Sequence, residues 1–168
     1  MHKVQFLKEI IIPCLKELDM DSIAARKLLM ITAATETRLG HYVRQCPTGP
    51  ALGAYGMERR TYYDNWDSVL QYKPELSKQV LQVCNYVSEP TSEVLIWDLR
   101  YATAMARIQY YRWPEKLPEP DNIHGLLKYY YKYWGPNPDK TSLEEVRSRV
   151  DGVLGNIEGE HWSNKYGS

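Results

Sequence analysis

The chain has 168 residues, and its 21 Lys and Arg are balanced by 21 Asp and Glu. This length suits one domain with a substantial core rather than two domains. A net charge of zero gives no reason to expect nucleic acid or a membrane surface as a partner. Charges interrupt every short apolar run near the N-terminus, so neither a signal peptide nor a membrane-spanning helix is predicted.

The three cysteines, Cys14, Cys46 and Cys84, are odd in number and widely spaced. They lack the paired spacing of metal ligands, and the four histidines show no zinc pattern. We interpret the cysteines as reduced thiols, with a single disulfide left open. Neither a metal nor a cofactor is expected.

The first predicted elements are two helical segments. Apolar residues at helical spacing predict a helix over 3–18, in which Pro13 causes a kink or begins a second helix. The next helix is expected over 23–39, with residues 21–22 offering an N-cap and Gly40 just beyond its C-terminus.

The rest of the chain is predicted to be helical between loops. Residues 41–60 form a Gly- and Pro-rich loop, and the helix from Ser92 to Arg112 has the clearest apolar face. Residues 141–144, Thr-Ser-Leu-Glu, predict a capping box that opens the last helix, which ends near Leu154. The remaining helices are expected over 61–70, 74–87 and 123–134. Strand signals are weak, so we predict an all-α domain over 1–154, followed by a polar tail over 155–168.

Glu36 is the residue that most directly suggests a function. It follows Leu29 and Thr32 at helical steps, so it continues a mostly apolar stripe. Burial and the negative end of the helix dipole would both raise its pKa. Such a carboxyl holds a proton near neutral pH and can act as a general acid. The alternative is a helix-end carboxylate that is paired with one of three arginines, Arg38, Arg44 or Arg107.

Three segments carry a resemblance to a known family: residues 33–40, Ala-Ala-Thr-Glu-Thr-Arg-Leu-Gly; residues 49–58, Gly-Pro-Ala-Leu-Gly-Ala-Tyr-Gly-Met-Glu; and residues 101–107. Together they resemble the lysozyme-like peptidoglycan lytic transglycosylases, particularly the compact versions carried in bacteriophage virions. The first segment is similar to the family's helix that ends in Glu-Ser. The second is similar to the loop that lines the sugar groove, and the third to a later helix that packs beneath the site.

The resemblance implies a lysozyme-like helical fold and a set of site residues. Glu36 would be the catalytic acid and base. The substrate-binding residues would be Thr37, Gly53, Tyr55, Gly56, Met57, Glu58 and Tyr101. Thr37 stands where the family has Ser and keeps its hydroxyl. Gly56 stands where the family has Gln, so a polar side chain is missing from the expected groove wall.

The activity implied by the resemblance is cleavage of the cell-wall glycan by a single carboxylate. Glu36 would protonate the glycosidic oxygen and then accept the proton of the sugar's own 6-hydroxyl, which leaves an anhydro product. Hydrolysis by two carboxylates would need a second acid within roughly 5–9.5 Å. Glu58 and Asp64 are the nearby candidates in the sequence.

The resemblance also implies a setting. The protein would be made in the host cytoplasm and carried in the virion, in its tail or baseplate. Its partners would be peptidoglycan glycan strands and other virion tail or baseplate proteins, with neither nucleic acid nor membrane among them. Two alternatives stay open: a weakly active or inactive scaffold in a phage tail or baseplate, and a cytoplasmic helical interaction module. The aromatic run 129–134 suits either a sugar platform or a subunit contact.

Overall fold

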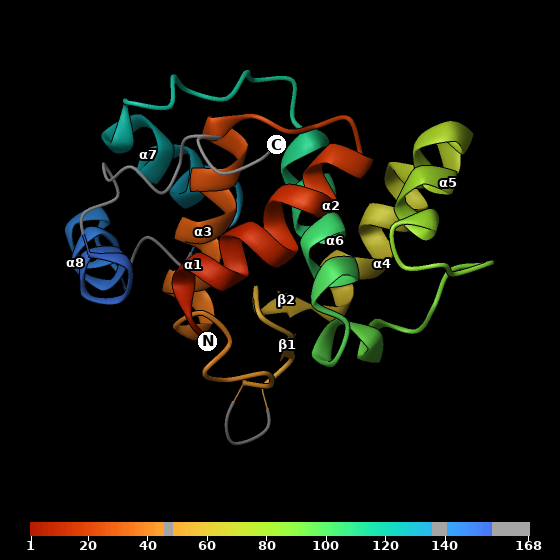
Figure 1. Cartoon of the computed structure of the whole chain (residues 1–168), viewed down its shortest axis with the longest axis horizontal. Coiled ribbons are helices and arrows are strands. Elements are labelled where there is room, and N and C mark those ends of the chain that lie inside the picture. Colours follow the sequence, from red (N-terminus) through yellow and green to blue (C-terminus); the bar gives the residue numbers. More distant parts are fainter. Residues whose placement is uncertain (46–48, 136–140, 156–168) are drawn as a thin grey trace.

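The computed structural model describes residues 1–45, 49–135 and 141–155. Helices make up most of this part of the chain, as the sequence predicts, and a short antiparallel hairpin joins them (Figure 1). The α-helices are α1 (Lys3–Gln5), α2 (Ile12–Glu17), α3 (Ile23–Thr37), α4 (Arg59–Ser68), α5 (Pro74–Gln82), α6 (Leu99–Tyr111), α7 (Ile123–Tyr133) and α8 (Leu143–Leu154). The remaining elements are the π-helix η1 (Phe6–Ile11), the 3-10 helices η2 (Leu70–Tyr72) and η3 (Ser92–Ile96), and the strands β1 (Ala51–Leu52) and β2 (Met57–Glu58).

Helix α3 runs through the centre of the fold. It packs against α6, α7, α8 and η1 (Figure 1). Every residue of α3 is buried except Ile23 at its start and Glu36 near its end. A helix that is covered on all sides belongs to the core. Glu36 is therefore the residue through which the C-terminal end of this core helix reaches solvent.

The N-terminal segment stays helical around Pro13. The π-helix η1 precedes the proline, and the N–H of Ile12 bonds to the carbonyl of Leu7. Pro13 then lies in the first turn of α2, directly after the π-helix. At the place where a kink or a second helix was expected, the chain therefore forms the wider turns of a π-helix and then the α-helix α2.

Several expected helix boundaries were wrong: α3, for example, ends at Thr37 rather than at residue 39, with Arg38 as its left-handed cap. The predicted helix over 92–112 is divided, since the Asp98 carboxylate accepts the N–H of Tyr101 at 2.9 Å and begins α6 there. The last helix begins one residue later than expected. Its capping box joins Ser142 to Glu145, whose carboxylate accepts the Ser142 N–H at 2.7 Å. Helix α5 also ends at Gln82, before the expected Val87.

The hairpin β1–β2 lies within the loop that was expected to lack strands. It pairs Ala51 with Glu58 and Leu52 with Met57. Gly53 opens its turn with φ of +71°, and a Cβ at this position would come within 2.0 Å of the Leu95 carbonyl oxygen. Only glycine fits such an approach. Gly53 thus anchors the hairpin against η3.

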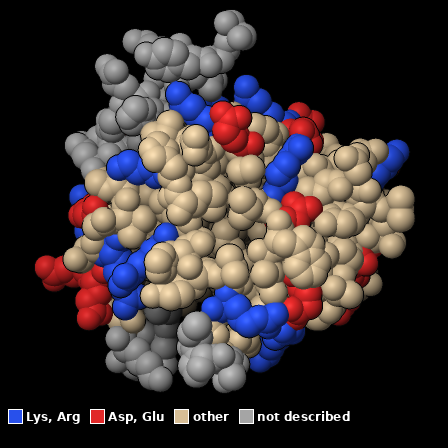
Figure 2. Space-filling view, turned by 60° about the horizontal axis from the view of Figure 1, so that its bottom comes forward, with Lys and Arg blue, Asp and Glu red and all other residues tan. Residues whose placement is uncertain are grey.

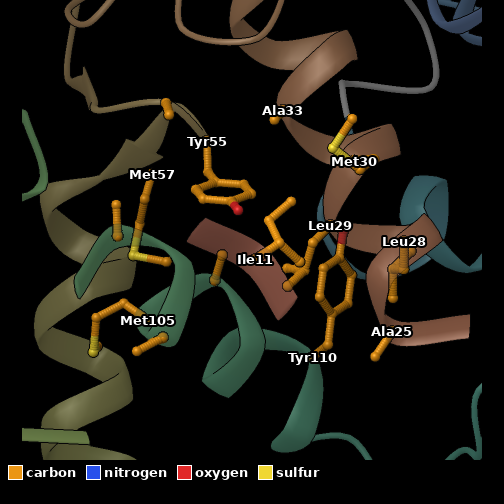
Figure 3. Packing of buried hydrophobic residues seen from close by; sticks show 14 of the residues in the cluster. Ile11, Ala25, Leu28, Leu29, Met30, Ala33, Tyr55, Met57, Met105 and Tyr110 are labelled. Atoms are coloured by element: carbon orange, nitrogen blue, oxygen red, sulfur yellow. The ribbon is translucent and has the colours of Figure 1, made fainter. Parts of the chain in front are cut away.

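The core extends from α3 to the hairpin. Figure 3 shows Leu28 and Leu29 of α3 beside Tyr110, and the ring of Tyr55 pointing from the hairpin toward Ile11. The hairpin is therefore held at the end of α3 by its own buried ring.

Several expectations fall on parts of the chain outside the described residues. They are the predicted polar tail after Gly155 and the thiol of Cys46. The other two cysteines, Cys14 and Cys84, are free thiols. Within 1–45, 49–135 and 141–155, no helix has the length and apolar character needed to cross a bilayer.

Candidate functional site

Three adjoining pockets meet at Glu36. The β1 pocket lies beside the hairpin and includes Gly53 and Gly56. The α4 pocket includes Glu58, Thr61, Gln109 and Trp134. The α8 pocket includes Arg38 and Arg149. Their volumes are about 320, 370 and 490 Å³, within the range of small-molecule sites. We call the three together the groove, with Glu36 at its centre.

The Glu36 carboxyl is held from behind by Tyr130 of α7. The Tyr130 hydroxyl donates to Glu36 Oε1 at 2.5 Å, and the Tyr130 side chain is fully buried. The other oxygen, Oε2, lies 3.5 Å from where a Cβ at residue 56 would be. One oxygen is thus fixed by the protein, and the other faces the glycine that borders the groove.

Burial raises the pKa of Glu36 to about 7, although the hydrogen bond from Tyr130 and the charge of Arg149 both lower it. The residue reaches solvent through the groove, but protein atoms surround its carboxyl on the other sides. The negative charge of Glu58 adds a smaller upward shift to this pKa. The upward shift of this pKa agrees in direction with the expectation from the sequence. A pKa of about 7 leaves the carboxyl partly protonated at neutral pH.

The backbone turns sharply just after Glu36. Arg38 and Leu39 have φ of +53° and +58°, in the left-handed region, which costs a non-glycine residue roughly 1–2 kcal/mol. Thr37 holds this turn to the hairpin, because its hydroxyl donates to the Ala54 carbonyl at 2.5 Å and accepts the Gly40 N–H at 2.8 Å. Thr37 therefore positions the end of α3 through its hydroxyl.

Gly56 lies directly against Glu36. Its φ is +59°, and a Cβ here would be 3.2 Å from the Glu36 Cβ. Both observations favour glycine, since a side chain would strain the turn and press on the carboxylate-bearing residue. At residue 56, where the family motif has Gln, the backbone therefore has a conformation that favours glycine.

We predict that Gly56→Ala lowers the free energy of unfolding by about 1–2 kcal/mol, because φ is positive there. Gly152→Ala is the matched control, since Gly152 lies inside α8 with no atom near its would-be Cβ. That change should instead raise stability by roughly 0.5–1 kcal/mol. Urea denaturation of both variants measures the two effects. Unchanged stability in Gly56→Ala would mean that the turn tolerates a side chain, and Gly56→Gln would then be expected to restore a groove contact.

The two tyrosines expected to bind substrate lie in the core instead. Tyr55 is 1% exposed and its hydroxyl is hydrogen-bonded with Thr103 at 2.9 Å. Tyr101 is completely buried, and its hydroxyl pairs with that of Tyr62 at 2.9 Å. Their aromatic rings support the hairpin and α4 from within, so neither side chain is available to a ligand in the groove.

The other expected residues border the groove. Gly53 and Gly56 line the β1 pocket with Thr37, whose hydroxyl has the structural role described above. Glu58 lines the α4 pocket with Glu36, whereas Met57 borders this pocket with its side chain buried in the core.

The arginines that offered an alternative role for Glu36 have other surroundings. Arg44 pairs with Glu93 at 2.5 Å, and Arg107 lies among the tyrosines of α6 and α7. Arg38 lines the α8 pocket, and no ion pair joins it to Glu36 within the described residues. Glu36 is thus bound to a neutral phenol rather than to a guanidinium.

The sequence did not single out Arg149 and Gln109 of the groove, and it named Tyr130 and Trp134 only as members of the aromatic run 129–134. Trp134 is half-buried and packs on Tyr110 with ring centroids 5.5 Å apart. Gln109 is 8% exposed, and its Oε1 has no hydrogen-bond partner within the described residues. The aromatic run 129–134 was the only signal for this wall, and its helical period alone could not tell which ring faces Glu36.

Across the part of the chain that the structure describes, no group of three or more His, Cys, Asp or Glu side chains is arranged to hold a metal ion. Comparison of the chain with protein-family models, with curated proteins and with solved structures finds no match. The function must therefore be argued from the groove itself.

Proposed function

We propose that this protein is a lysozyme-like lytic transglycosylase that cleaves the glycan strands of peptidoglycan, with Glu36 as its only acid and base. One observation carries the proposal: a carboxyl with a pKa of about 7 stands where three pockets meet. A general acid works best when its pKa lies near the working pH. The core helix that ends in Glu36 and faces a glycine-rich hairpin supports the lysozyme-like arrangement.

The geometry suggests which oxygen carries the proton. Oε1 accepts the Tyr130 hydrogen bond, so the proton would lie on Oε2, on the Gly56 side. Oε2 gives this proton to the glycosidic oxygen as the bond from that oxygen to the anomeric carbon breaks. The carboxylate that remains is stabilised by Tyr130 and by the charge of Arg149. It then takes the proton of the sugar's 6-hydroxyl, whose oxygen closes the anhydro ring.

A second carboxylate would change the outcome to hydrolysis. Asp64 is unsuited to this role, because it accepts hydrogen bonds from Ser68 and Arg112 outside the groove. Glu58 lines the α4 pocket together with Glu36 and is the candidate that could activate a water molecule. The products distinguish the two reactions.

The proposed setting is a phage tail or baseplate, where the protein would act on the cell wall during entry. This part of the proposal rests on the resemblance of residues 33–40 and 49–58. Glycan strands and neighbouring virion proteins are the proposed partners.

A second candidate function is a scaffold that keeps this fold without the activity. Gly56 favours it, because the hairpin offers no polar side chain at this position next to Glu36. Substrate positioning can be lost while the carboxyl remains.

Incubation of the purified chain with cell-wall sacculi, followed by mass spectrometry of the soluble products, tests the proposal. We expect fragments that end in an anhydro sugar. Fragments with ordinary reducing ends would assign hydrolysis and direct attention to Glu58. Intact sacculi would contradict the enzymatic proposal and favour the scaffold.

A further inference from the structure

The α8 pocket is lined by two arginines, whereas Arg44, which lines the β1 pocket, is paired with Glu93. The α8 pocket lies between the end of α3 and α8, and Arg38 and Arg149 line it together with Glu36. Both arginine side chains are exposed. Figure 2 shows one face of the molecule, on which Lys and Arg side chains lie in several small groups around a mostly uncharged surface. The pocket therefore offers guanidinium groups to whatever enters it.

These two arginines are not engaged elsewhere in the described residues. Neither forms an ion pair or a side-chain hydrogen bond there, whereas Arg147, on the same helix as Arg149, pairs with Asp151 at 3.5 Å. Arg38 is held at the pocket by its left-handed backbone, because the next residue, Leu39, is buried in the core. Arg38 thus takes the left-handed conformation that commonly ends a helix, and this cap fixes its position beside the pocket.

The opposite end of the groove has the reverse character. The α4 pocket is lined by Glu58 and by the Gln109 side chain, whose Oε1 has no partner within the described residues. A carboxylate that entered this pocket would meet negative charge and an acceptor oxygen. Donors such as hydroxyl or amide N–H groups suit it better. The groove thus has a basic end and an acidic end, with Glu36 between them.

We propose that the α8 pocket binds a carboxylate carried by the amino sugar next to the scissile bond, and that Arg38 and Arg149 are its ligands. The proposal rests on the function proposed above, because it places a glycan strand in the groove. Guanidinium groups bind carboxylates through paired, charge-assisted hydrogen bonds. The carboxylate has two possible sources in peptidoglycan: the lactyl group of a sugar that carries no peptide, or the peptide itself where it is joined to the lactyl group by an amide bond. A bound carboxylate would also fix the direction of the strand across Glu36.

Three probes separate these cases in NMR titrations of the full chain. N-acetylglucosamine has no carboxylate, N-acetylmuramic acid has a lactyl carboxylate, and N-acetylmuramoyl dipeptide carries its carboxylate on the peptide. We expect at least one of the two acidic probes to bind about tenfold more tightly than the neutral sugar, as is typical of partly exposed charged contacts. Tighter binding of the muramic acid identifies the lactyl group, and tighter binding of the dipeptide alone identifies the peptide.

The double variant Arg38→Gln with Arg149→Gln should remove this preference. Arg147→Gln should keep it, because it removes a charge from the same helix but outside the pocket. Equal binding of all three probes would overturn the inference and leave the proposed function standing. If the double variant still binds an acidic probe more tightly than N-acetylglucosamine, the inference is likewise overturned and the proposed function stands. If no probe shifts residues of the groove, the proposed function fails together with the inference.

Discussion

Replacing Glu36 with Gln should abolish lysis of cell walls, with a loss of at least about 10²–10⁴-fold, since general acid catalysis is typically worth that much. Gln keeps the shape and can still accept the Tyr130 hydrogen bond, but it has no proton to transfer. A turbidity assay on purified cell walls measures the loss. Asp64→Asn is the matched control, because Asp64 is a nearby carboxylate that binds Arg112 outside the groove. It should keep activity within a few-fold, as expected for an exposed ion pair.

The same variant should also be more stable than the parent at high pH. Burial raises the pKa of Glu36 from 4.5 to about 7, so the folded state binds its proton more tightly than the unfolded state. This group's contribution to stability is therefore lost as pH rises from about 4.5 to about 7. Gln carries no such penalty. Thermal unfolding should give equal Tm values at pH 4 and a higher Tm for the variant at pH 8. A loss of activity accompanied by a lower Tm at both pH values would mean that the substitution damages the fold.

Tyr130→Phe should move the pH dependence of cleavage upward. Activity requires protonated Glu36, so it should fall as pH rises through about 7. The Tyr130 hydroxyl donates to the carboxylate and lowers its pKa, so its removal should raise that pKa by about one pH unit. The midpoint of the fall in cleavage rate should then lie about one pH unit higher.

Tyr129→Phe provides the control for this shift. Tyr129 lies next to Tyr130 on α7, but its hydroxyl donates to the Glu115 carbonyl at 2.8 Å, away from the groove. Its removal should leave the pH profile unchanged. If both variants shift the profile equally, or neither does, Tyr130 does not tune the acid.

Much of the fold could be predicted because the helices carry their own signals. Ser22 caps α3 by accepting the Ala25 N–H at 3.1 Å, and α3 is apolar enough to be recognised as a core helix. The break before α6 could not be predicted from the apolar period. It depends on the single Asp98 cap, which lies within an otherwise continuous helical pattern.

The hairpin β1–β2 escaped prediction for a different reason. Each strand is only two residues long, which is too short for an alternating pattern to appear. Its position is fixed by contacts distant in the sequence, such as that of Gly53 with the Leu95 carbonyl.

The candidate site divides in the same way. Glu36 could be found because it continues the apolar stripe of its own helix. Tyr130 could not, since it lies 94 residues away and reaches Glu36 only when α7 packs on α3. The burial of Tyr55 and Tyr101 was equally hidden, because a tyrosine in a loop or on a helix suits a groove and a core alike.

The most direct test is an NMR titration of the Glu36 side-chain carboxyl in the full chain, with Glu36→Gln used to assign its signal. The groove described here predicts a pKa of about 7, because burial outweighs the Tyr130 hydrogen bond and the Arg149 charge. A pKa at or below 4.5, the ordinary value, would show that the carboxyl is ionised at neutral pH. Glu36 could not then serve as the acid that cleaves a glycan strand.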